Sequence, residues 1–206
     1  MSSRKDVLLR PARVPLKAAG WRKQAGLGNI YLRELRPGVV AWLALGGHWG
    51  GGYQHLDARP RLGVRHDTEE RHAASLLGVD PDRSSAPTIM GDLARLVPSR
   101  IGSQDWRLYV ADGDDNADTW RTVMEDIDQH ATPWWEERTS DEQLVAAIRR
   151  GEGNDTARLV LPLLLLALGR PDAARQAVES GRGRHTGLVV DYDAYATRLL
   201  AEIDAT

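Results

Sequence analysis

The chain of 206 residues contains no cysteine and no phenylalanine, and only three lysines and three methionines. Without cysteine there is no disulfide framework, no cysteine-ligated zinc or iron–sulfur site and no thiol nucleophile. Without phenylalanine, the aromatic part of a core has to come from the seven Trp and five Tyr. Apolar residues make up 42% and charged residues 27%, which is typical of a globular protein and not of a disordered or fibrous one.

Long apolar runs and targeting signals are also missing. Pro11 and Pro15, with the arginines beside them, interrupt the N-terminal apolar residues, so no signal-peptide core forms. The most apolar segment, 159–168, is too short to cross a bilayer as a helix and contains Pro162. We therefore expect a soluble, cytoplasmic protein with no membrane partner.

The formal net charge is only −2, but the charges are unevenly distributed. Residues 1–80 carry 13 Lys and Arg against 7 Asp and Glu, whereas residues 105–142 carry 12 acidic residues against three arginines. The small total argues against a dedicated nucleic-acid binder, which has a strongly basic domain. The acidic segment is typical either of solvated helix faces or of a surface that steers a basic partner.

Hydrophobic periodicity predicts strands up to about residue 110 and helices from about 117. The turn signal at residues 36–38 joins the first two long strands into a hairpin, and both faces of the second strand are apolar, which predicts an inner strand. The expected strands are 29–35, 39–45, 56–64 (weakened by Pro60) and 106–110. We expect an α+β fold with an antiparallel β-sheet and packed helices, followed by an all-helical C-terminal extension. The predicted domains are 1–138 and 139–206.

Caps and breakers set the expected helix ends. Asp67 with Glu70, and Ser140 with Gln143, have the spacing of capping boxes. Thr132-Pro133 is expected to end a helix, because the residue before proline disfavours the helical conformation. The expected helices are 3–20 (interrupted by two prolines), 67–77, 90–96, 118–131, 141–151, 155–168, 171–179 and 191–203.

The glycine-rich segment 46–52 lacks any phosphate-binding glycine motif and is followed by no clear helix. We expect a flexible loop that presents His48, Trp49 and Tyr53. One alternative function uses segment 46–53 as the lid of a small-ligand-binding regulatory module.

Possible metal ligands do not form a compact motif. A second alternative, a metal-dependent hydrolase, would use His48, His55, His66 and nearby acids, but no HExxH spacing joins them. Residues 112–118 superficially look like a calcium loop, but Ala117 and Val123 stand where Gly and Glu are required. No GxSxG motif occurs either. We therefore predict no metal site, no cofactor and no catalytic residue.

Two adjacent tryptophans follow Pro133. Neighbouring side chains on a helix or strand point in different directions, so at most one of Trp134 and Trp135 fits readily into a narrow core stripe. The other either fills a gap between the sheet and the C-terminal helices or is exposed to a partner, since Trp is enriched at binding hot spots.

The order of these landmarks resembles that of small bacterial domains of the immunity-protein type in polymorphic-toxin loci. The resemblance covers about 14–150 and rests on the segment Leu16 to Arg22, the hairpin 31–45, the string 131–135 and the cap at Ser140-Asp141. Trp21 stands where such domains carry Phe. The resemblance implies a non-enzymatic protein that binds and blocks a partner, and it matches no functional residue.

The leading prediction is thus a cytoplasmic protein-binding protein, in the narrower form an immunity- or antitoxin-like inhibitor of a toxin or nuclease. Its acidic surface would mimic nucleic acid and cover the basic cleft of the partner, without direct nucleic-acid binding by this chain. The predicted partner-binding residues are Asp112, Asp114, Asp115, Glu125, Asp128, Trp134, Trp135 and Trp49.

Overall fold

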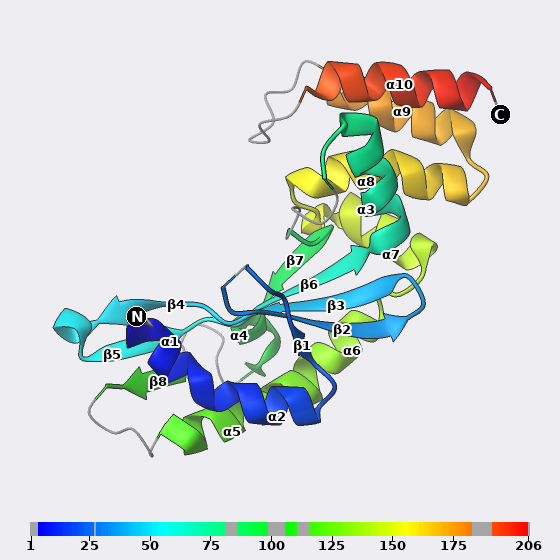
Figure 1. Ribbon diagram of the computed structural model, residues 1–206. Helices are drawn as coiled ribbons and strands as arrows, with labels where there is room; N and C mark the ends of the chain where they lie inside the picture. Colours follow the sequence, from blue (N-terminus) through cyan, green and yellow to red (C-terminus); the bar gives the residue numbers. More distant parts are fainter. Residues whose placement is uncertain are drawn as a thin grey trace. The chain divides into compact units, whose positions relative to one another are not determined.

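The computed structural model describes residues 4–26, 28–80, 86–98, 106–110, 116–182 and 191–205. Its strands form two antiparallel sheets, which confirms the predicted α+β class. The five-stranded sheet has the order β1-β2-β3-β6-β7, and the three-stranded sheet has the order β4-β5-β8 (Figure 1). The strands are β1 (Arg22–Lys23), β2 (Ile30–Arg36), β3 (Val39–Ala44), β4 (Gly47–Gly50), β5 (His55–Ala58), β6 (Arg61–His66), β7 (Ile89–Asp92) and β8 (Trp106–Tyr109).

The helices lie close to the predicted ranges. Ser140 and Gln143 form the expected capping box, and Pro171 occupies the first turn of its helix. The helices are α1 (Arg4–Leu9), η1 (Arg10–Ala12), α2 (Arg13–Ala18), η2 (Gly51–Tyr53), α3 (Asp67–Leu77), α4 (Leu93–Leu96), α5 (Asn116–Asp126), η5 (Ile127–Ala131), α6 (Thr132–Glu136), α7 (Asp141–Ala147), η6 (Ile148–Glu152), α8 (Asp155–Ala167), α9 (Pro171–Gly181) and α10 (Tyr192–Asp204).

The chain divides into two compact units. Unit 1 comprises Met1–Leu35, Ala41–Gly63 and Gly91–Glu136, and unit 2 comprises Arg36–Val40, Val64–Met90 and Glu137–Thr206. The last of these boundaries lies close to the predicted domain boundary at 138/139. Residues 36–40 and 64–90, which that prediction assigned to the first domain, group with the C-terminal helices.

The predicted hairpin forms, and β3 is an inner strand between β2 and β6. Five of its six residues are buried, because a strand covered on both faces needs apolar side chains in every position. The strand expected at 56–64 is divided into β5 and β6 on either side of Pro60. Proline has no N–H to donate to a strand ladder, which accounts for the break.

Tryptophan replaces phenylalanine in the core of unit 1. Trp42, Trp106 and Trp120 are buried, as the sequence predicted. The indole N–H of Trp120 donates to the backbone oxygen of Leu8 at 2.9 Å, and that of Trp106 to Asp126 at 2.9 Å. These bonds let the rings of Trp106 and Trp120 take the place of phenyl rings without leaving their own donors unsatisfied, whereas the N–H of Trp42 is buried with no hydrogen-bond partner among the described residues.

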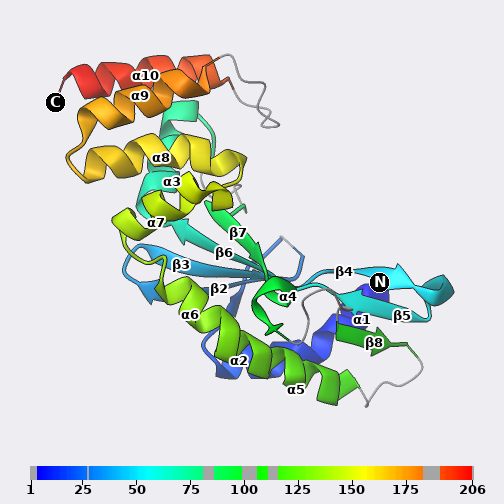
Figure 2. The same ribbon diagram turned by 180° about the vertical axis from the view of Figure 1, so that it is seen from behind.

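Unit 2 is built around α8, which is apolar on nearly every side. Its neighbours α3, α7 and α9 pack against it, and α10 packs on α9 and α3 (Figures 1 and 2). The Tyr195 hydroxyl of α10 donates to the backbone oxygen of Leu159 in α8 at 2.5 Å, and burial raises the pKa of Tyr195. No helix in the described ranges is long and apolar enough to cross a membrane.

Two predicted helix boundaries are wrong. The helix expected at 90–96 begins as strand β7 and becomes helical only at Leu93, where Asp92 caps it. Thr132-Pro133 does not end a helix, because the preceding turn η5 is π-helical and Thr132 N–H bonds to Ile127. A wider turn tolerates a residue without an N–H, so the chain continues into α6.

Glu70 is not the capping residue that its spacing with Asp67 predicted. The N-cap of α3 is His66, with no side-chain hydrogen bond, and Glu70 is buried on the inner face of the helix. Thr88 Oγ1 donates to Glu70 Oε1 at 2.5 Å, and Arg65 Nε lies 3.3 Å from Oε2. Burial raises the pKa of Glu70 to about 7, against the opposing effect of Arg65.

Replacing Glu70 with Gln should remove a pH dependence of stability. Since the pKa of Glu70 rises from 4.5 to about 7 on folding, the folded chain holds the extra proton between those values. Its free energy of unfolding therefore falls as pH rises through that window, by about 3 kcal/mol for this group. His66, whose pKa is lowered by burial, acts in the opposite direction, so the difference between wild type and Glu70→Gln is the informative quantity.

Urea unfolding at about pH 5 and about pH 8 measures that difference. Glu142→Gln, at an exposed position in the same unit, is the matched control. Its unfolding free energy should change between the two pH values by as much as that of the wild type. If the unfolding free energy of Glu70→Gln changes with pH as much as that of the wild type, the pH dependence does not come from Glu70.

Candidate binding site on the three-stranded sheet

The three-stranded sheet of unit 1 has one apolar face and one polar face. The register pairs His48 with Asp57 and Asp57 with Arg107, so these three side chains share a face. His55 and Tyr109 pair on the same face one step along. The opposite face carries Trp49, which pairs with Leu56, and four buried side chains, namely Leu56, Ala58, Trp106 and Leu108.

Asp57 is the centre of the polar face. Its Oδ2 lies 3.5 Å from the Nε2 atoms of both His48 and His55, and Arg107 Nε donates to its Oδ1 at 2.9 Å. The residue is only 8% exposed, and the ion pair with Arg107 compensates for the burial of its charge. The hydrogen bond to Asp57 is the main reason why the pKa of Arg107 is raised, followed by a bond to Tyr109. One carboxylate thus orients two imidazoles and one guanidinium.

Glycines make this arrangement possible, which corrects the prediction of a flexible loop at 46–52. A Cβ at position 47 would lie 2.3 Å from the backbone oxygen of Asp57, and one at position 50 would lie 2.2 Å from His55 Nε2. Glycine therefore lets strand β4 approach β5 and leaves room for the His55 ring. Low strand propensity made the segment look like a loop, and the close approach to β5 outweighs it.

The turn between β4 and β5 holds a tyrosine in an unusual conformation. Gly51, Gly52 and Tyr53 have successive φ angles of 55°, 63° and 71°, and Tyr53 is the one non-glycine residue of the described chain with positive φ. A left-handed conformation costs a residue with a Cβ about 1–2 kcal/mol. The Tyr53 ring packs on Trp49 with centroids 5.9 Å apart and remains 65% exposed.

Aromatic and apolar side chains gather at this end of the sheet. Val110 N–H donates to Gln54 O at 3.0 Å, so the end of β8 lies beside the turn, and the Tyr109 ring lies 5.8 Å from that of His55. Tyr109 and Val110 are 43% and 42% exposed. We call the set Trp49, Tyr53, His55, Tyr109 and Val110 the arm tip.

The outer edge of β8 is closed by α5. The Asn116 side chain accepts from Tyr109 N–H at 2.9 Å and donates to Tyr109 O at 2.8 Å, and Thr119 Oγ1 donates to Arg107 O at 3.4 Å. These groups use the backbone positions that an added strand would need. A partner of this sheet is therefore expected to contact side chains and not to extend the ladder along β8.

The predicted acidic residues do not form one described surface. Asp112, Asp114 and Asp115 lie outside the described residues. Glu125 and Asp128 are exposed on α5 and η5, as a partner-binding function requires. Other acids of the segment have partners within the chain. Asp126 accepts from Trp106, and Asp118 pairs with Arg121 at 2.7 Å.

The tryptophan pair is divided between core and surface, as its adjacency predicted. Trp135 is fully buried, and its indole N–H donates to Gly63 O at 2.9 Å, so its side chain is not exposed to a partner in this structure. Trp134 is half-buried and lies against Gly91, where a Cβ would come within 3.1 Å of its ring.

Arg33 is a half-buried cation that contacts two tryptophan rings and interacts with acidic side chains of the segment 105–142. Its guanidinium lies 4.8 Å from the ring of Trp21 and 5.6 Å from that of Trp135, in a cation–π arrangement. Burial lowers the pKa of Arg33, and the charges of Asp128 and Glu136 partly oppose that shift. Asp128 therefore stabilises the half-buried cation of Arg33 in its own chain.

The three histidines of the metal-dependent alternative do not act as one group. His48 and His55 meet at Asp57 in unit 1, whereas His66 belongs to unit 2, where its Nδ1 lies 3.2 Å from Asp141 Oδ1. Within the described ranges, no group of three or more His, Asp or Glu side chains is placed to hold a metal ion. Asp57, Arg107 and Tyr109 were not predicted as site residues, although the His-x-Asp and Arg-x-Tyr alternation marked them as one face of paired strands.

Comparison with protein-family models, with curated proteins and with solved structures finds no match.

Alanine substitutions at the glycines should differ in effect according to what the new methyl group meets. Gly47→Ala should destabilise most, by about 2–3 kcal/mol or more, because its neighbour is backbone. Gly50→Ala should cost about 1–2 kcal/mol, because the His55 ring can move aside. Gly46→Ala, whose nearest neighbour is 4.0 Å away, is the control and should cost less than either.

Thermal or urea unfolding measures these differences, and a double-mutant cycle tests their cause. In the background of His55→Ala, Gly50→Ala should no longer destabilise the protein appreciably, whereas Gly47→Ala should destabilise it as much as before. Equal costs for Gly46→Ala and Gly50→Ala would contradict the proposed role of glycine.

Proposed function

We propose that the chain acts by binding another protein, and that the arm tip is its docking surface. One observation carries the proposal. Seven large apolar side chains are exposed in the described residues, and three of them, Tyr53, Tyr109 and Val110, come from the turn between β4 and β5 and from the end of β8, which the bond from Val110 N–H to Gln54 O joins. Scattered single apolar residues are normal on a protein surface, whereas a group of them indicates an interaction site.

The composition of the tip supports the same function. Binding energy at protein interfaces is concentrated in Trp, Tyr and Arg, and the tip combines Trp49, Tyr53 and Tyr109 with the neighbouring Arg107. Tyr53 also holds an unfavourable backbone conformation that glycine would adopt without cost. Backbone strain of this kind clusters at ligand-binding sites.

The charges beside the tip favour a partner with an acidic segment. His48, His55 and Arg107 lie on the polar face, and the one carboxylate among them, Asp57, is nearly buried and already engaged by all three. Arg107 is charge-balanced by Asp57, so what the face offers to a partner is the N–H donors of its guanidinium and imidazole groups. Carboxylates of a partner fit such a surface, and opposite charges accelerate association.

A narrower proposal concerns the consequence of binding. Inhibition of a toxin or nuclease, as an immunity- or antitoxin-like protein, rests on the resemblance of residues 14–150. In that case the exposed Glu125 and Asp128 of α5 and η5, not the arm tip, would face the basic cleft of the partner. The two surfaces are distinct, so substitutions can distinguish them.

Capture of proteins from the source organism with immobilised variants tests the docking surface. Tyr53→Gly combined with Tyr109→Ser should lose the protein that the wild type retains, since each hot-spot aromatic contributes about 2 kcal/mol, or roughly 30-fold in affinity. Glu125→Lys should retain it, and so should Val14→Ser, which alters an exposed apolar side chain of α2.

Thermal unfolding of Tyr53→Gly shows whether a loss of partner binding reflects unfolding of the chain. Tyr53→Gly relieves the left-handed strain but adds backbone entropy to the unfolded state, and these terms of about 1 kcal/mol each offset one another. Its melting temperature should therefore stay close to that of the wild type. Retention of the partner by the tip variant, with loss in Glu125→Lys, would overturn the arm tip in favour of the acidic surface.

A further inference from the structure

The outer edge of strand β4 is a second feature of unit 1. In the sheet order β4-β5-β8, strand β4 has a neighbour on one side only (Figure 1). Natural proteins place lysine, other charged residues or proline in edge strands, which keeps the edge from pairing with another chain. Strand β4, Gly47–Gly50, contains no Lys, Arg, Asp, Glu or Pro. Its own sequence therefore does not protect this edge.

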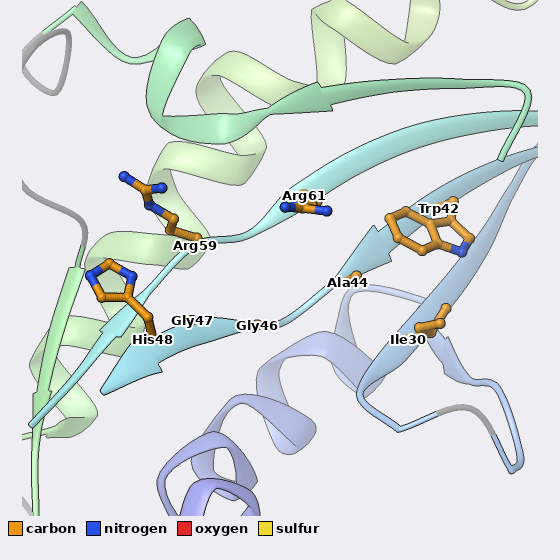
Figure 3. Close-up of a pocket in the computed structure, with 8 residues that line it drawn as sticks. All are labelled: Ile30, Trp42, Ala44, Gly46, Gly47, His48, Arg59 and Arg61. Carbon is orange, nitrogen blue, oxygen red and sulfur yellow. The ribbon is translucent and has the colours of Figure 1, made fainter. Parts of the chain in front are cut away.

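Hydrogen bonds at both ends of β4 establish the direction of its backbone groups. Arg59 N–H donates to Gly46 O at 2.8 Å, and Gln54 N–H donates to Gly50 O at 3.2 Å. Figure 3 shows Gly46 and Gly47 leading into β4, beside the segment that carries Arg59. The carbonyl groups of Gly46 and Gly50 are therefore directed toward β5 and the turn that follows β4.

The alternation of an antiparallel strand then assigns the residues between these two glycines. Successive residues direct their N–H and C=O groups to opposite sides of the strand. His48, in register with Asp57, faces β5, whereas Gly47 and Trp49 direct their N–H and C=O groups away from the sheet. The bond from Lys5 Nζ to Gly47 O, at 3.2 Å, agrees with this outward direction, because Lys5 belongs to α1 and not to the sheet.

Most of the outward groups are unoccupied. Among the residues that the structure describes, the N–H of Gly47 and the N–H and C=O of Trp49 have no hydrogen-bond partner. Gly47 O accepts from Lys5, and a carbonyl oxygen can accept a second hydrogen bond. The outer edge of β8 differs, because side chains of α5 occupy its backbone positions.

The chemistry of this edge determines what fits it. A row of outward N–H and C=O groups is complementary to the backbone of another extended chain, which adds to the sheet as a strand. Gly47 has no side chain, so a residue paired with it has room for a large side chain on the face that carries Trp49. Lys5 adds a cation beside this position, which favours an acidic side chain in the incoming segment.

The edge is continuous with the arm tip. Trp49 supplies backbone groups to the edge, and its ring packs on Tyr53 with centroids 5.9 Å apart. A segment paired with β4 therefore extends along the strand to the turn that holds Tyr53. In strand addition, backbone hydrogen bonds supply affinity, and contacts with particular side chains supply specificity. The edge and the arm tip can thus act on one partner.

We propose that the protein partner adds an extended segment to β4, as a fourth strand of the three-stranded sheet. The segment exchanges backbone hydrogen bonds with Gly47 and Trp49, places an acidic side chain near Lys5 and continues onto the arm tip. This inference rests on the proposed function, because it specifies how the same partner binds. Pairing of β4 between two copies of the chain is the competing arrangement.

Residue-resolved hydrogen exchange of the free full-length chain tests whether the edge is open. The Trp49 amide should be at least tenfold less protected than the His48 amide, because only His48 faces β5. Equal protection of the two amides at every concentration would overturn the proposal, since another part of the chain would then occupy the edge. Protection of Trp49 that appears only at high concentration would overturn it in favour of pairing between two copies.

The same measurement on the purified complex with the protein captured by the wild type tests the added strand. The Trp49 amide should become at least tenfold more protected than in the free chain. If the ring signals of Tyr53 and Tyr109 shift while the Trp49 amide stays unprotected, strand addition is overturned and the arm tip remains the docking surface. Absence of both changes would overturn the arm tip as well, so the two failures are distinguishable.

Two substitutions at position 49 isolate the backbone group. Trp49→Pro and Trp49→Ala both lose the ring, but only proline also removes the outward N–H. Trp49→Pro should bind the captured protein at least tenfold more weakly than Trp49→Ala, because an acceptor of the partner is left unpaired. Their melting temperatures should be similar, since this N–H has no bond within the described chain.

Equal affinity of the folded Trp49→Pro and Trp49→Ala variants would overturn the proposal. If Trp49→Pro fails to fold, protection of the Trp49 amide in the wild-type complex decides the question, because that measurement alters no residue.

Discussion

The close approach of strands β4 and β5 is the constraint on which the polar face of unit 1 depends. It requires that positions 47 and 50 carry no Cβ, since a methyl group at either would overlap Asp57 O or the His55 ring. Because the strands are that close, Asp57 reaches His48, His55 and Arg107 at once. The arm tip lies at one end of these paired strands, where the turn between β4 and β5 meets the end of β8.

Several buried polar groups are paired over long stretches of sequence, whereas the indole N–H groups of Trp21 and Trp42 are buried without a hydrogen-bond partner among the described residues. Trp120 with Leu8, Trp135 with Gly63 and Trp106 with Asp126 each join distant segments through an indole N–H. A core of tryptophan in place of phenylalanine therefore needs specific acceptors as well as space. Within unit 1, aromatic packing and hydrogen bonding act at the same residues, and Arg33 between Trp21 and Trp135 adds a cation to that packing.

Local signals in the sequence predicted most elements, because caps and turns act over a few residues. Ser140 with Gln143, Pro171 and the turn at 36–38 are such signals, and each lies where it was expected. Features that depend on distant partners were not predictable from spacing. Glu70 has the spacing of a capping residue, yet Thr88 and burial determine its role. The glycine-rich segment 46–52 has the composition of a loop, and its strand becomes evident only from the close approach to β5. Trp135 could be assigned to the core only once Gly63 was known to accept its N–H.

The central claim is that a protein partner docks on the arm tip. Hydrogen exchange of the chain, alone and with its captured partner, tests it most directly, because exchange reports the site of contact without altering any residue. We expect slower exchange at residues 49–55 and 106–110 in the complex, with little change in α5 or in helices α8 to α10. Protection confined to α5, or to the helices of unit 2, would contradict it.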